Sequence, residues 1–483
     1  MGYQLSVFEN VPTSTWLILL TLSTCVGYSL FWVLRGVYRL YLHPLSRYPG
    51  PKLAIVDPAW FELVYNYWGE NRCMLVWQLE KFHQTYGPVV RLGPNTLHIN
   101  DPEIYQRMAK VTSGFLKDPD FYQLIMLPSV VSETDPKKHR VRRQVLAPAF
   151  SISRVTEHAK WIESKAESLN SRLEQFAHSD TPVNVLKLCN AFIIDIATRL
   201  LLATDHECVL DPDFRSDFVD LLHAVLQQTW LAFVAPTTTR AMYKLPPSIQ
   251  KWIFPLPIRK FAQSRRVRSD IIEQLIDPNA AKGHVVPQGE SLMSEVIILM
   301  TAAVDTSSTV MYQGIYQICR NNDIYKSLVR ELDHAFPGDS KITYKVAKQL
   351  PYLTAVIQES LRWASPVPGR LPRQVPAEGF ELYGHRIPGG TIMQTSAILL
   401  NNHKDVFSHP EQFDPDRWTQ GETSRELEKY MVSFYHGSRG CLGKDLAWCE
   451  MYVFMANLFR RFSVSVHDTT DKDMKFKDSF LSL

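Results

Sequence analysis

The residues with the clearest chemical potential surround a cysteine near the C-terminal end of the chain. Cys441 lies in a glycine-rich segment, with Gly437 and Gly440 before it and Gly443 after it, directly ahead of a stretch with helical periodicity. Glycines allow the backbone to pass close to a flat ligand, and the positive end of a helix favours a thiolate. A thiolate is a soft ligand for iron, so the segment predicts a metal-binding cysteine. The alternative is a buried structural cysteine in a tight turn.

A second group of polar side chains lies in an apolar stretch that we expect to form a helix over residues 294–319. In it, the small residues Ala302 and Ala303 come just before Asp305 and Thr306. In an ordinary buried helix, the hydroxyl of Thr306 would donate to the carbonyl oxygen one turn earlier. Beside a cofactor, the same hydroxyl could widen the helix locally, hold water and deliver protons. The residues alone leave both interpretations open.

A carboxylate and a guanidinium lie three residues apart at Glu359 and Arg362. This spacing places them on one face of a helix, where they can form an ion pair. Such pairs are common on protein surfaces and contribute little there, so the spacing alone does not predict a buried pair.

Taken together, these segments resemble the cytochrome P450 family. Its haem-binding signature, Phe-x-x-Gly-x-Arg-x-Cys-x-Gly, is matched by Phe434, Gly437, Arg439, Cys441 and Gly443. The resemblance covers nearly the whole chain and implies a haem b cofactor with Cys441 as the axial ligand of the iron. It also implies that Phe434 packs near the thiolate and that Arg439 binds a haem propionate. A thiolate ligand favours cleavage of the O–O bond.

The same resemblance assigns roles to the other motifs. Glu359 and Arg362 are similar to the family's Glu-x-x-Arg motif, completed by Arg417 in a structural cluster behind the haem. Asp305 and Thr306 resemble the family's acid and threonine for proton delivery. Ala303 stands where the family usually has glycine, which implies a slightly tighter oxygen groove.

Further propionate partners are expected from two places, because anionic propionates need cationic or hydrogen-bonding groups. His139 and Arg143 resemble the family's Trp-x-x-x-Arg helix, with His139 in the aromatic position. Arg373 resembles the family's arginine after the Glu-x-x-Arg helix. The alternative for His139 is an exposed helix position.

The N-terminal part of the chain predicts a membrane anchor over residues 1–40. No charged residue occurs from Trp16 to Leu34, a run that as a helix covers roughly 28 Å, about one hydrocarbon core. A cleaved signal peptide is the alternative, but an acidic residue precedes the run and basic residues follow it. Basic residues on the C-terminal side predict a single span with the catalytic body in the cytoplasm. The resemblance to microsomal members implies the endoplasmic reticulum membrane.

The elements that follow the anchor in the sequence must position these motifs. Three prolines in residues 41–54 predict a stiff extended stalk. Residues 89–99 predict a hairpin, followed by a helix capped by Asp101. Residues 137–361 have mainly helical periodicity, residues 380–399 form a second β-rich patch, and residues 442–459 are again helical. Without an internal linker, residues 55–483 are expected to form one haem-binding domain, mainly α with minor β-sheets.

Composition excludes some classes of function. The 52 basic and 49 acidic residues give a formal charge of +3 and are spread along the chain, so nucleic acid is not an expected partner. Seven scattered cysteines fit a reducing compartment. The resemblance to the cytochrome P450 family implies a membrane-bound monooxygenase that takes electrons from an NADPH-dependent reductase and oxidises a hydrophobic small molecule. Alternatives are a haem-thiolate isomerase or dehydratase without a reductase, and a non-catalytic membrane-tethered haem protein.

The amino-acid sequence of the stalk looks like that of filamentous fungal members of the family. This resemblance implies secondary metabolite tailoring of a terpenoid, polyketide or alkaloid. Substrate contacts are expected from residues 115–127, from Ile298 and Ala302, and from residues 367–369. The chain ends at Leu483, whereas the family usually continues into a terminal hairpin beside the substrate, so one wall of the pocket is expected to be incomplete.

Overall fold

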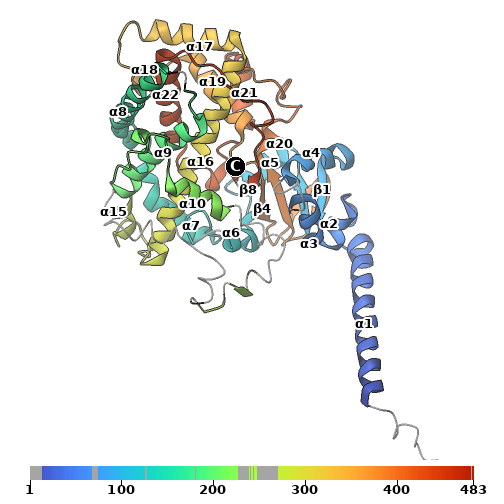
Figure 1. Cartoon of the computed structure of the whole chain (residues 1–483). Helices are drawn as coiled ribbons and strands as arrows, with labels where there is room; N and C mark the ends of the chain where they lie inside the picture. Colours follow the sequence, from blue (N-terminus) through green and yellow to red (C-terminus); the bar gives the residue numbers. More distant parts are fainter. Residues whose placement is uncertain are drawn as a thin grey trace, which may run out of the picture.

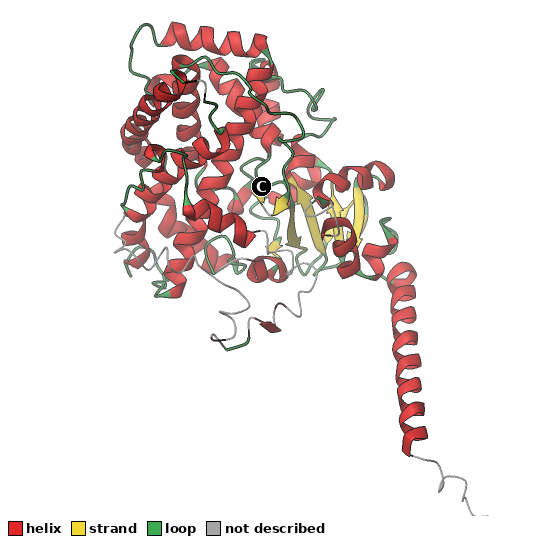
Figure 2. Ribbon diagram, in the orientation of Figure 1, coloured by secondary structure: helices red, strands yellow, loops and turns green. Residues whose placement is uncertain are grey.

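The computed structural model describes residues 13–67, 74–125, 128–179, 181–226, 270–479 and 481–482, with a few isolated positions between 227 and 269. The described part is mainly helical, with small sheets gathered on one side (Figure 2). Most of the expected helical stretch that falls at 227–269, and the substrate contacts expected from Met126 and Leu127, lie outside the described residues.

The described helices are α1 (Thr13–Val37), α2 (Lys52–Val56), α3 (Pro58–Glu62), α4 (Leu75–Tyr86), α5 (Pro102–Ala109), α6 (Pro119–Ile125), α7 (Pro136–Leu146), α8 (Ile152–Ala177), α9 (Val185–Leu202), α10 (Asp217–Leu226), α15 (Asp270–Ile276), α16 (Glu290–Arg320), α17 (Asn322–Ala335), α18 (Tyr344–Ala347), α19 (Pro351–Ala364), α20 (Ala397–Asn401), α21 (Glu422–Tyr430) and α22 (Lys444–Arg461). Several begin where the sequence supplies a cap followed by a proline. Asp101 accepts from the backbone N–H of Ile104, and Asp135 accepts from Lys137, each directly before a proline in the first turn.

The main sheet has the strand order β1-β2-β7-β4-β3, from β1 (Val89–Gly93), β2 (Thr96–Ile99), β3 (Leu116–Lys117), β4 (Arg370–Gln374) and β7 (Ile392–Ser396). The β1–β2 hairpin confirms the sequence prediction, while β2 and β7 run parallel and join distant parts of the chain. β5 (Phe380–Leu382) pairs with β6 (His385–Ile387), and β8 (Asp478–Ser479) pairs with β9 (Leu481–Ser482).

Two boundaries of the predicted β-rich patch were wrong. Its strands end at Ser396, and the next residues form α20. The prediction also missed β4, because Pro372 interrupts its pattern and proline is normally excluded from the interior of a sheet. β4 nevertheless lies between β7 and β3, and it brings Arg373 opposite Lys117.

The helical core is built around α16, about 46 Å long, which packs against α9, α19 and α22. Gly314 allows α16 and α19 to approach closely, because a Cβ there would collide with the side chain of Ser360. In Figure 1, α16 crosses the middle of the molecule between the helical side and the sheet. It therefore forms a rigid wall for whatever lies between the two.

The N-terminal helix α1 projects away from the body beside the sheet (Figure 1). Residues Ser14–Leu42 are long and apolar enough to span a membrane, with a mean hydropathy of 2.0 and no buried residue in the best window. This is consistent with the predicted anchor.

The predicted stalk differs from expectation, because part of it belongs to the domain. Leu45 and Tyr48 are buried against the sheet, and a Cβ at Gly50 would collide with the backbone of Arg91. The guanidinium of Arg91 donates to the carbonyl oxygen of Arg39 at 2.8 Å. The prolines do end the helix, but tertiary contacts hold the following residues on the domain surface instead of leaving a free spacer.

Candidate active site

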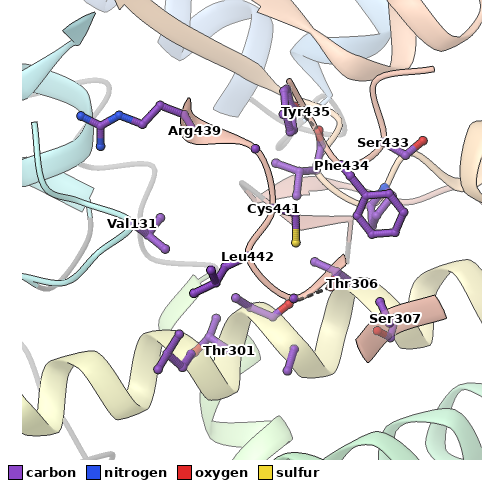
Figure 3. A pocket seen from close by; sticks show the side chains of 18 of the residues that line it. Val131, Thr301, Thr306, Ser307, Ser433, Phe434, Tyr435, Arg439, Cys441 and Leu442 are labelled. Carbon is purple, nitrogen blue, oxygen red and sulfur yellow. Dashed lines mark hydrogen bonds between the residues drawn. The ribbon is translucent and has the colours of Figure 1, made fainter. Parts of the chain in front are cut away.

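Cys441 lies in a loop between the short helix η7 (Gly437–Arg439) and α22, and its sulfur points into a cavity toward α16 (Figure 3). The backbone N–H of Cys441 donates to the carbonyl oxygen of Phe434 at 2.8 Å, which closes the loop. Gly437 has a φ of +73°, and a Cβ there would collide with the carbonyl oxygen of Ala109. Gly443 lines the cavity, and a Cβ at this position would stand in open space. The loop thus leaves room for a flat group beside the sulfur.

The protein alone does not make Cys441 a thiolate. The helix α22 begins at Lys444, two residues later than the sequence predicted, so Cys441 is not in its first turn. Burial raises the pKa of the Cys441 thiol, and the N–H of Gly443 with the charges of Arg143 and Lys444 offset this only in part. A metal ion bound at the sulfur would supply the missing stabilisation, because coordination deprotonates a thiol.

The wall of α16 opposite Cys441 carries Thr306, with Ala302 and Ala303 one turn before it. The hydroxyl of Thr306 donates to the carbonyl oxygen of Ala302 at 2.7 Å. α16 is a regular α-helix throughout, without a local widening at Thr306. Thr306 thus has the local hydrogen bond of an ordinary helix threonine, but its side chain lies in the cavity facing Cys441 (Figure 3).

Asp305 points away from the cavity that Thr306 lines. Its carboxylate Oδ1 lies 2.8 Å from Nε2 of His223 on α10. Burial lowers the pKa of His223, but the hydrogen bond and charge of Asp305 outweigh it, and the net pKa is raised. Sequence analysis paired Asp305 with Thr306 and missed His223. Consecutive helix residues point about 100° apart, so adjacency in sequence did not bring the two side chains to one site.

One part of the cavity wall collects basic side chains, namely Lys117, His139, Arg143, Arg373 and Arg439. Arg143 donates to the carbonyl oxygen of Gly440 at 2.8 Å, and Arg439 donates to that of Glu133 at 2.7 Å. Glu450 carries the sole carboxyl group among the described lining residues, and it does not pair with any of them. Four of these basic residues were predicted from the sequence. Lys117 was missed, because its place beside Arg373 depends on the β3–β4 pairing.

The basic groups repel one another in the protein alone. Burial and the neighbouring charges of Arg373 and Arg439 lower the pKa of Lys117 far below its usual value. Burial and the charges of neighbouring basic residues lower the pKa of His139 to about 3. His139 is 5% exposed, so its alternative as an exposed helix residue is wrong. A ligand with two carboxylates would relieve this repulsion, and the donors therefore fit the propionates of a haem.

Behind the cavity, Glu359 is fully buried with two arginines. Arg362 binds both of its carboxylate oxygens, with an Nη2–Oε1 distance of 2.7 Å, and Nε of Arg417 lies 3.2 Å from Oε2. The indole N–H of Trp418 donates to the same Oε2 at 2.8 Å. The remaining donors of Arg362 reach backbone carbonyl oxygens of the loop around residues 401–412. The cluster is a buried, fully bonded network rather than a surface pair, and Trp418 was the member that sequence analysis missed.

The rest of the cavity wall is mainly apolar, and Ile298, Ala302 and Val367, which we expected to contact the substrate, line it. Phe115 does not line it and packs on Phe380, with 5.1 Å between ring centroids. Leu481 of β9 does line it. The described residues at this end fold back as a short hairpin against α16, so they contribute to the wall of the cavity.

Comparison with known proteins agrees with this geometry. The model of the family described as Cytochrome P450 matches residues 57–483. The cytochrome P450 monooxygenase sol6 of Alternaria solani is 41% identical over 92% of this chain and 98% of its own length. The cytochrome P450 monooxygenase macH of Penicillium terrestre is 29% identical, with 98% and 96% covered. A third, aneF of Aspergillus aculeatus, is 30% identical, with 92% and 93% covered.

All three relatives come from fungi and carry the same description, as the sequence resemblance implied. The matched residues include the cysteine loop, the α16 wall and the buried Glu359 cluster. The chain therefore belongs to the cytochrome P450 family of haem-thiolate monooxygenases.

Proposed function

We propose that this protein is a membrane-bound monooxygenase in which Cys441 ligates the iron of haem b. It inserts one oxygen atom from O2 into a hydrophobic small molecule, with electrons from an NADPH-dependent reductase. The observation that carries the proposal is the position of the Cys441 sulfur, which faces Thr306 across an apolar cavity with basic groups along one part of its wall.

The residues divide the work by their chemistry. Arg143, Arg373 and Arg439, with His139 and Lys117, would hold the propionates through charge-assisted hydrogen bonds. The bound haem supplies the activation of O2. Thr306 is positioned to hold and pass a proton, because its hydroxyl lies on the wall opposite the sulfur.

The apolar part of the wall would select the substrate. Ile298, Val310, Leu361, Val367 and Leu481 line it. Such a surface binds an apolar molecule by removing it from water and offers few groups to orient a polar one. Fungal secondary metabolite tailoring is the proposed setting. Metabolite profiling of the enzyme with a reductase and candidate terpenoid, polyketide or alkaloid precursors tests it, and turnover of none of them would contradict it.

We place the protein in the endoplasmic reticulum membrane, with the catalytic domain in the cytoplasm. Arg35, Arg39, Arg47 and Lys52 follow the uncharged run that ends at Leu34, and they support that orientation. Deleting residues 1–36 should release the protein from membranes and leave haem bound, because the domain contacts begin near Arg39. Loss of haem from this variant, or continued membrane binding, would contradict the separation of anchor and domain.

Electron delivery would use the face of the protein behind Cys441. Lys444 is exposed there and can attract an acidic donor, whereas Arg460 is engaged by the carbonyl oxygens of Phe336 and Gly338. We therefore assign docking to the Lys444 side rather than to Arg460.

The decisive experiment is the absorption spectrum of the reduced protein with carbon monoxide. The wild type should show the red-shifted Soret band of thiolate-ligated haem, and Cys441→Ala should lose it. Cys449→Ala is the matched control, because Cys449 is buried eight residues later in α22 and does not line the cavity. A band that survives in Cys441→Ala would overturn the assignment. Turnover without NADPH and reductase would favour an isomerase or dehydratase, and no turnover of any substrate would favour a non-catalytic haem protein.

A further inference from the structure

One turn on the wall of the cavity is bound by a buried acid that lies outside the cavity. Val130 and Val131, in the loop between α6 and α7, line the cavity that contains Cys441. The backbone N–H of Val130 donates to the carboxylate of Glu295 on α16, at 2.9 Å from Oε1 and 3.2 Å from Oε2. Glu295 is fully buried and is not among the described lining residues. The carboxylate thus holds this part of the wall from behind.

The position of Glu295 on α16 continues the row of side chains that faces the cavity. Leu299, Ala302 and Thr306 line the cavity, and they follow Glu295 by four, seven and eleven residues. At about 100° per residue, all three lie within roughly 40° of Glu295 around the helix. The row therefore borders the cavity from Thr306 to Leu299 and is covered by the Val130 turn at Glu295. This turn is where the apolar space along α16 ends.

The turn of residues 129–132 is closed by hydrogen bonds of its own. The N–H of Ser129 donates to Oγ of Ser132 at 2.8 Å, and the N–H of Ser132 donates to Oγ of Ser129 at 3.3 Å. The N–H of Glu133 donates to the carbonyl oxygen of Ser129 at 3.0 Å. The turn is therefore a compact unit, and its bond to Glu295 fixes where that unit lies relative to α16.

Arg142 of α7 balances the charge of Glu295. Its Nε lies 2.6 Å from Oε2, and its Nη2 donates to Oγ of Ser291 at 3.4 Å. A buried ion pair seldom stabilises a protein more than apolar side chains of similar size do. What an acid provides at position 295, and an apolar side chain would not, is an acceptor for the backbone N–H of Val130.

We propose that Glu295 is a positioning residue that fixes the turn of residues 129–132 over the end of the apolar cavity, and so limits the length of the hydrophobic molecule that the cavity accepts. The proposal rests on the monooxygenase function above and adds a size limit to its substrate. Glu295 acts through the turn, because Val130 and Val131 are the residues that would contact the substrate.

1-Alkylimidazoles, from methyl to dodecyl, can measure the length of the cavity in the ferric holoenzyme. The imidazole nitrogen binds the haem iron and shifts the Soret band, which gives a dissociation constant, while the alkyl group extends along the apolar wall. In the wild type, each added methylene should tighten binding by up to about fourfold until the alkyl group meets the turn. Longer alkyl groups should add no affinity, and the length at which the gain stops is the quantity to compare.

Glu295→Met keeps the approximate size of the side chain and removes the acceptor for Val130. The turn should then move away from α16 more readily, so the gain should continue for about two further methylenes. The longest ligands should bind roughly 15-fold more tightly than they bind the wild type. 1-Methylimidazole should bind both proteins equally, because it is too short to reach the turn.

Ser132→Ala is a second, independent variant, because it loosens the turn and leaves the Glu295 side chain in place. It should shift the length limit in the same direction as Glu295→Met, and it tests the proposal even if Glu295→Met yields little holoprotein.

Arg142→Met is the matched control. It removes the counter-charge of Glu295 but leaves a carboxyl oxygen for the N–H of Val130. It should lower the free energy of unfolding and leave the length limit unchanged. If it shifts the limit as far as Glu295→Met does, Glu295 serves only as a member of an ion pair and the proposal is wrong.

The same length limit in the wild type, Glu295→Met and Ser132→Ala, with the carbon monoxide band intact in each, would overturn the role of Glu295 and leave the monooxygenase assignment standing. Affinity that keeps rising up to dodecyl in the wild type would also overturn it, because the turn would then not end the cavity. Loss of the carbon monoxide band in the wild type would instead refute the proposed function.

Discussion

Two buried regions of this molecule concentrate charge in opposite ways. Around Glu359, each charged group has a partner, because two arginines, an indole N–H and backbone groups converge on one carboxylate. Along the cavity, Lys117, His139 and Arg439 lie close together without a carboxylate partner on the described wall.

This difference in charge pairing distinguishes a structural cluster from a ligand-binding site. A network such as that of Glu359, in which each charged group has a partner within the protein, stabilises the fold without a ligand. Buried groups of like charge destabilise the protein alone, so their presence indicates a ligand of opposite charge. On this criterion, the Glu359 cluster is part of the scaffold and the cavity wall is a binding site.

The largest effect is expected where a closed network is broken. Glu359→Ala should lower the free energy of unfolding by about 3–5 kcal/mol, because it leaves two buried guanidinium groups without their counter-charge. Urea unfolding of the protein lacking residues 1–36, together with its haem content, measures this. The matched control is Glu157→Ala, which removes an exposed pair of the same spacing with Arg154 and should cost less than about 1 kcal/mol. Equal losses in the two variants would refute the contrast.

The next largest effect is expected for Thr306→Ala. Folding, the carbon monoxide spectrum and NADPH oxidation should persist, while product per NADPH falls and hydrogen peroxide per NADPH rises, by up to about 10²-fold. The control is Thr301→Ala, because Thr301 also lines the cavity and also donates to the carbonyl oxygen one turn earlier. Stoichiometry of NADPH, peroxide and product decides the outcome. If both variants remain fully coupled, Thr306 is an ordinary helix threonine.

Lys117→Met should weaken haem binding more than it weakens the fold. A hydrogen bond to a charged group contributes about 1.5–3 kcal/mol, so haem should transfer to an acceptor protein roughly 10–100 times faster. The unfolding free energy of the apoprotein should decrease by no more than about 1.5 kcal/mol, because the change removes one hydrogen bond, from Nζ of Lys117 to the carbonyl oxygen of Val131, and relieves crowding of basic groups. Lys165→Met is the matched control, since Lys165 is equally buried but paired with Asp195 and Asp205. It should destabilise the fold and leave haem transfer unchanged, and the opposite pattern would refute the comparison.

The smallest effect concerns two buried histidines, His83 and His98, which are fully hydrogen-bonded but neutral. Nδ1 of His83 lies 2.8 Å from the carbonyl oxygen of Gly87, its Nε2 lies 2.7 Å from Nδ1 of His98, and Nε2 of His98 lies 2.9 Å from the hydroxyl of Ser396. One proton on each Nδ1 satisfies the chain without a charge. Burial lowers the pKa of His83 to about 4 and that of His98 well below its usual value.

Acid should therefore destabilise the sheet side of the domain. As the pH falls below 6.5, these histidines become protonated in the unfolded chain but stay neutral in the folded protein. Protonation therefore favours the unfolded state, and stability is lost between pH 6.5 and about 4. The loss from His83 should be roughly 1 kcal/mol between pH 6.5 and 5.5. Urea unfolding of wild type and His83→Gln measures it, and the variant should have the shallower pH dependence. The same slope in both proteins would show that His83 is not held neutral.

Local patterns predicted much of this protein correctly. The β1–β2 hairpin, the cap of α5, the apolar N-terminal helix and the mainly α class all depend on residues close together in the chain. The failures have a common cause. β4 contains Pro372 and is a strand because β7 and β3 pair with it, and residues 45–50 are buried because the sheet lies beside them.

The candidate site divides in the same way. The spacing around Cys441 and between Glu359 and Arg362 was determined by the sequence itself, since each motif acts over less than three helical turns. Only the tertiary structure decided which acid meets which base. Asp305 forms a hydrogen bond with His223, and Glu359 accepts one from Trp418. Lys117 lies at the cavity because β3 pairs with β4. Glu450 was left in the cavity with Ser307 alone. Burial and charge partners are properties of segments far apart in the chain, and they set the protonation states on which the chemistry depends.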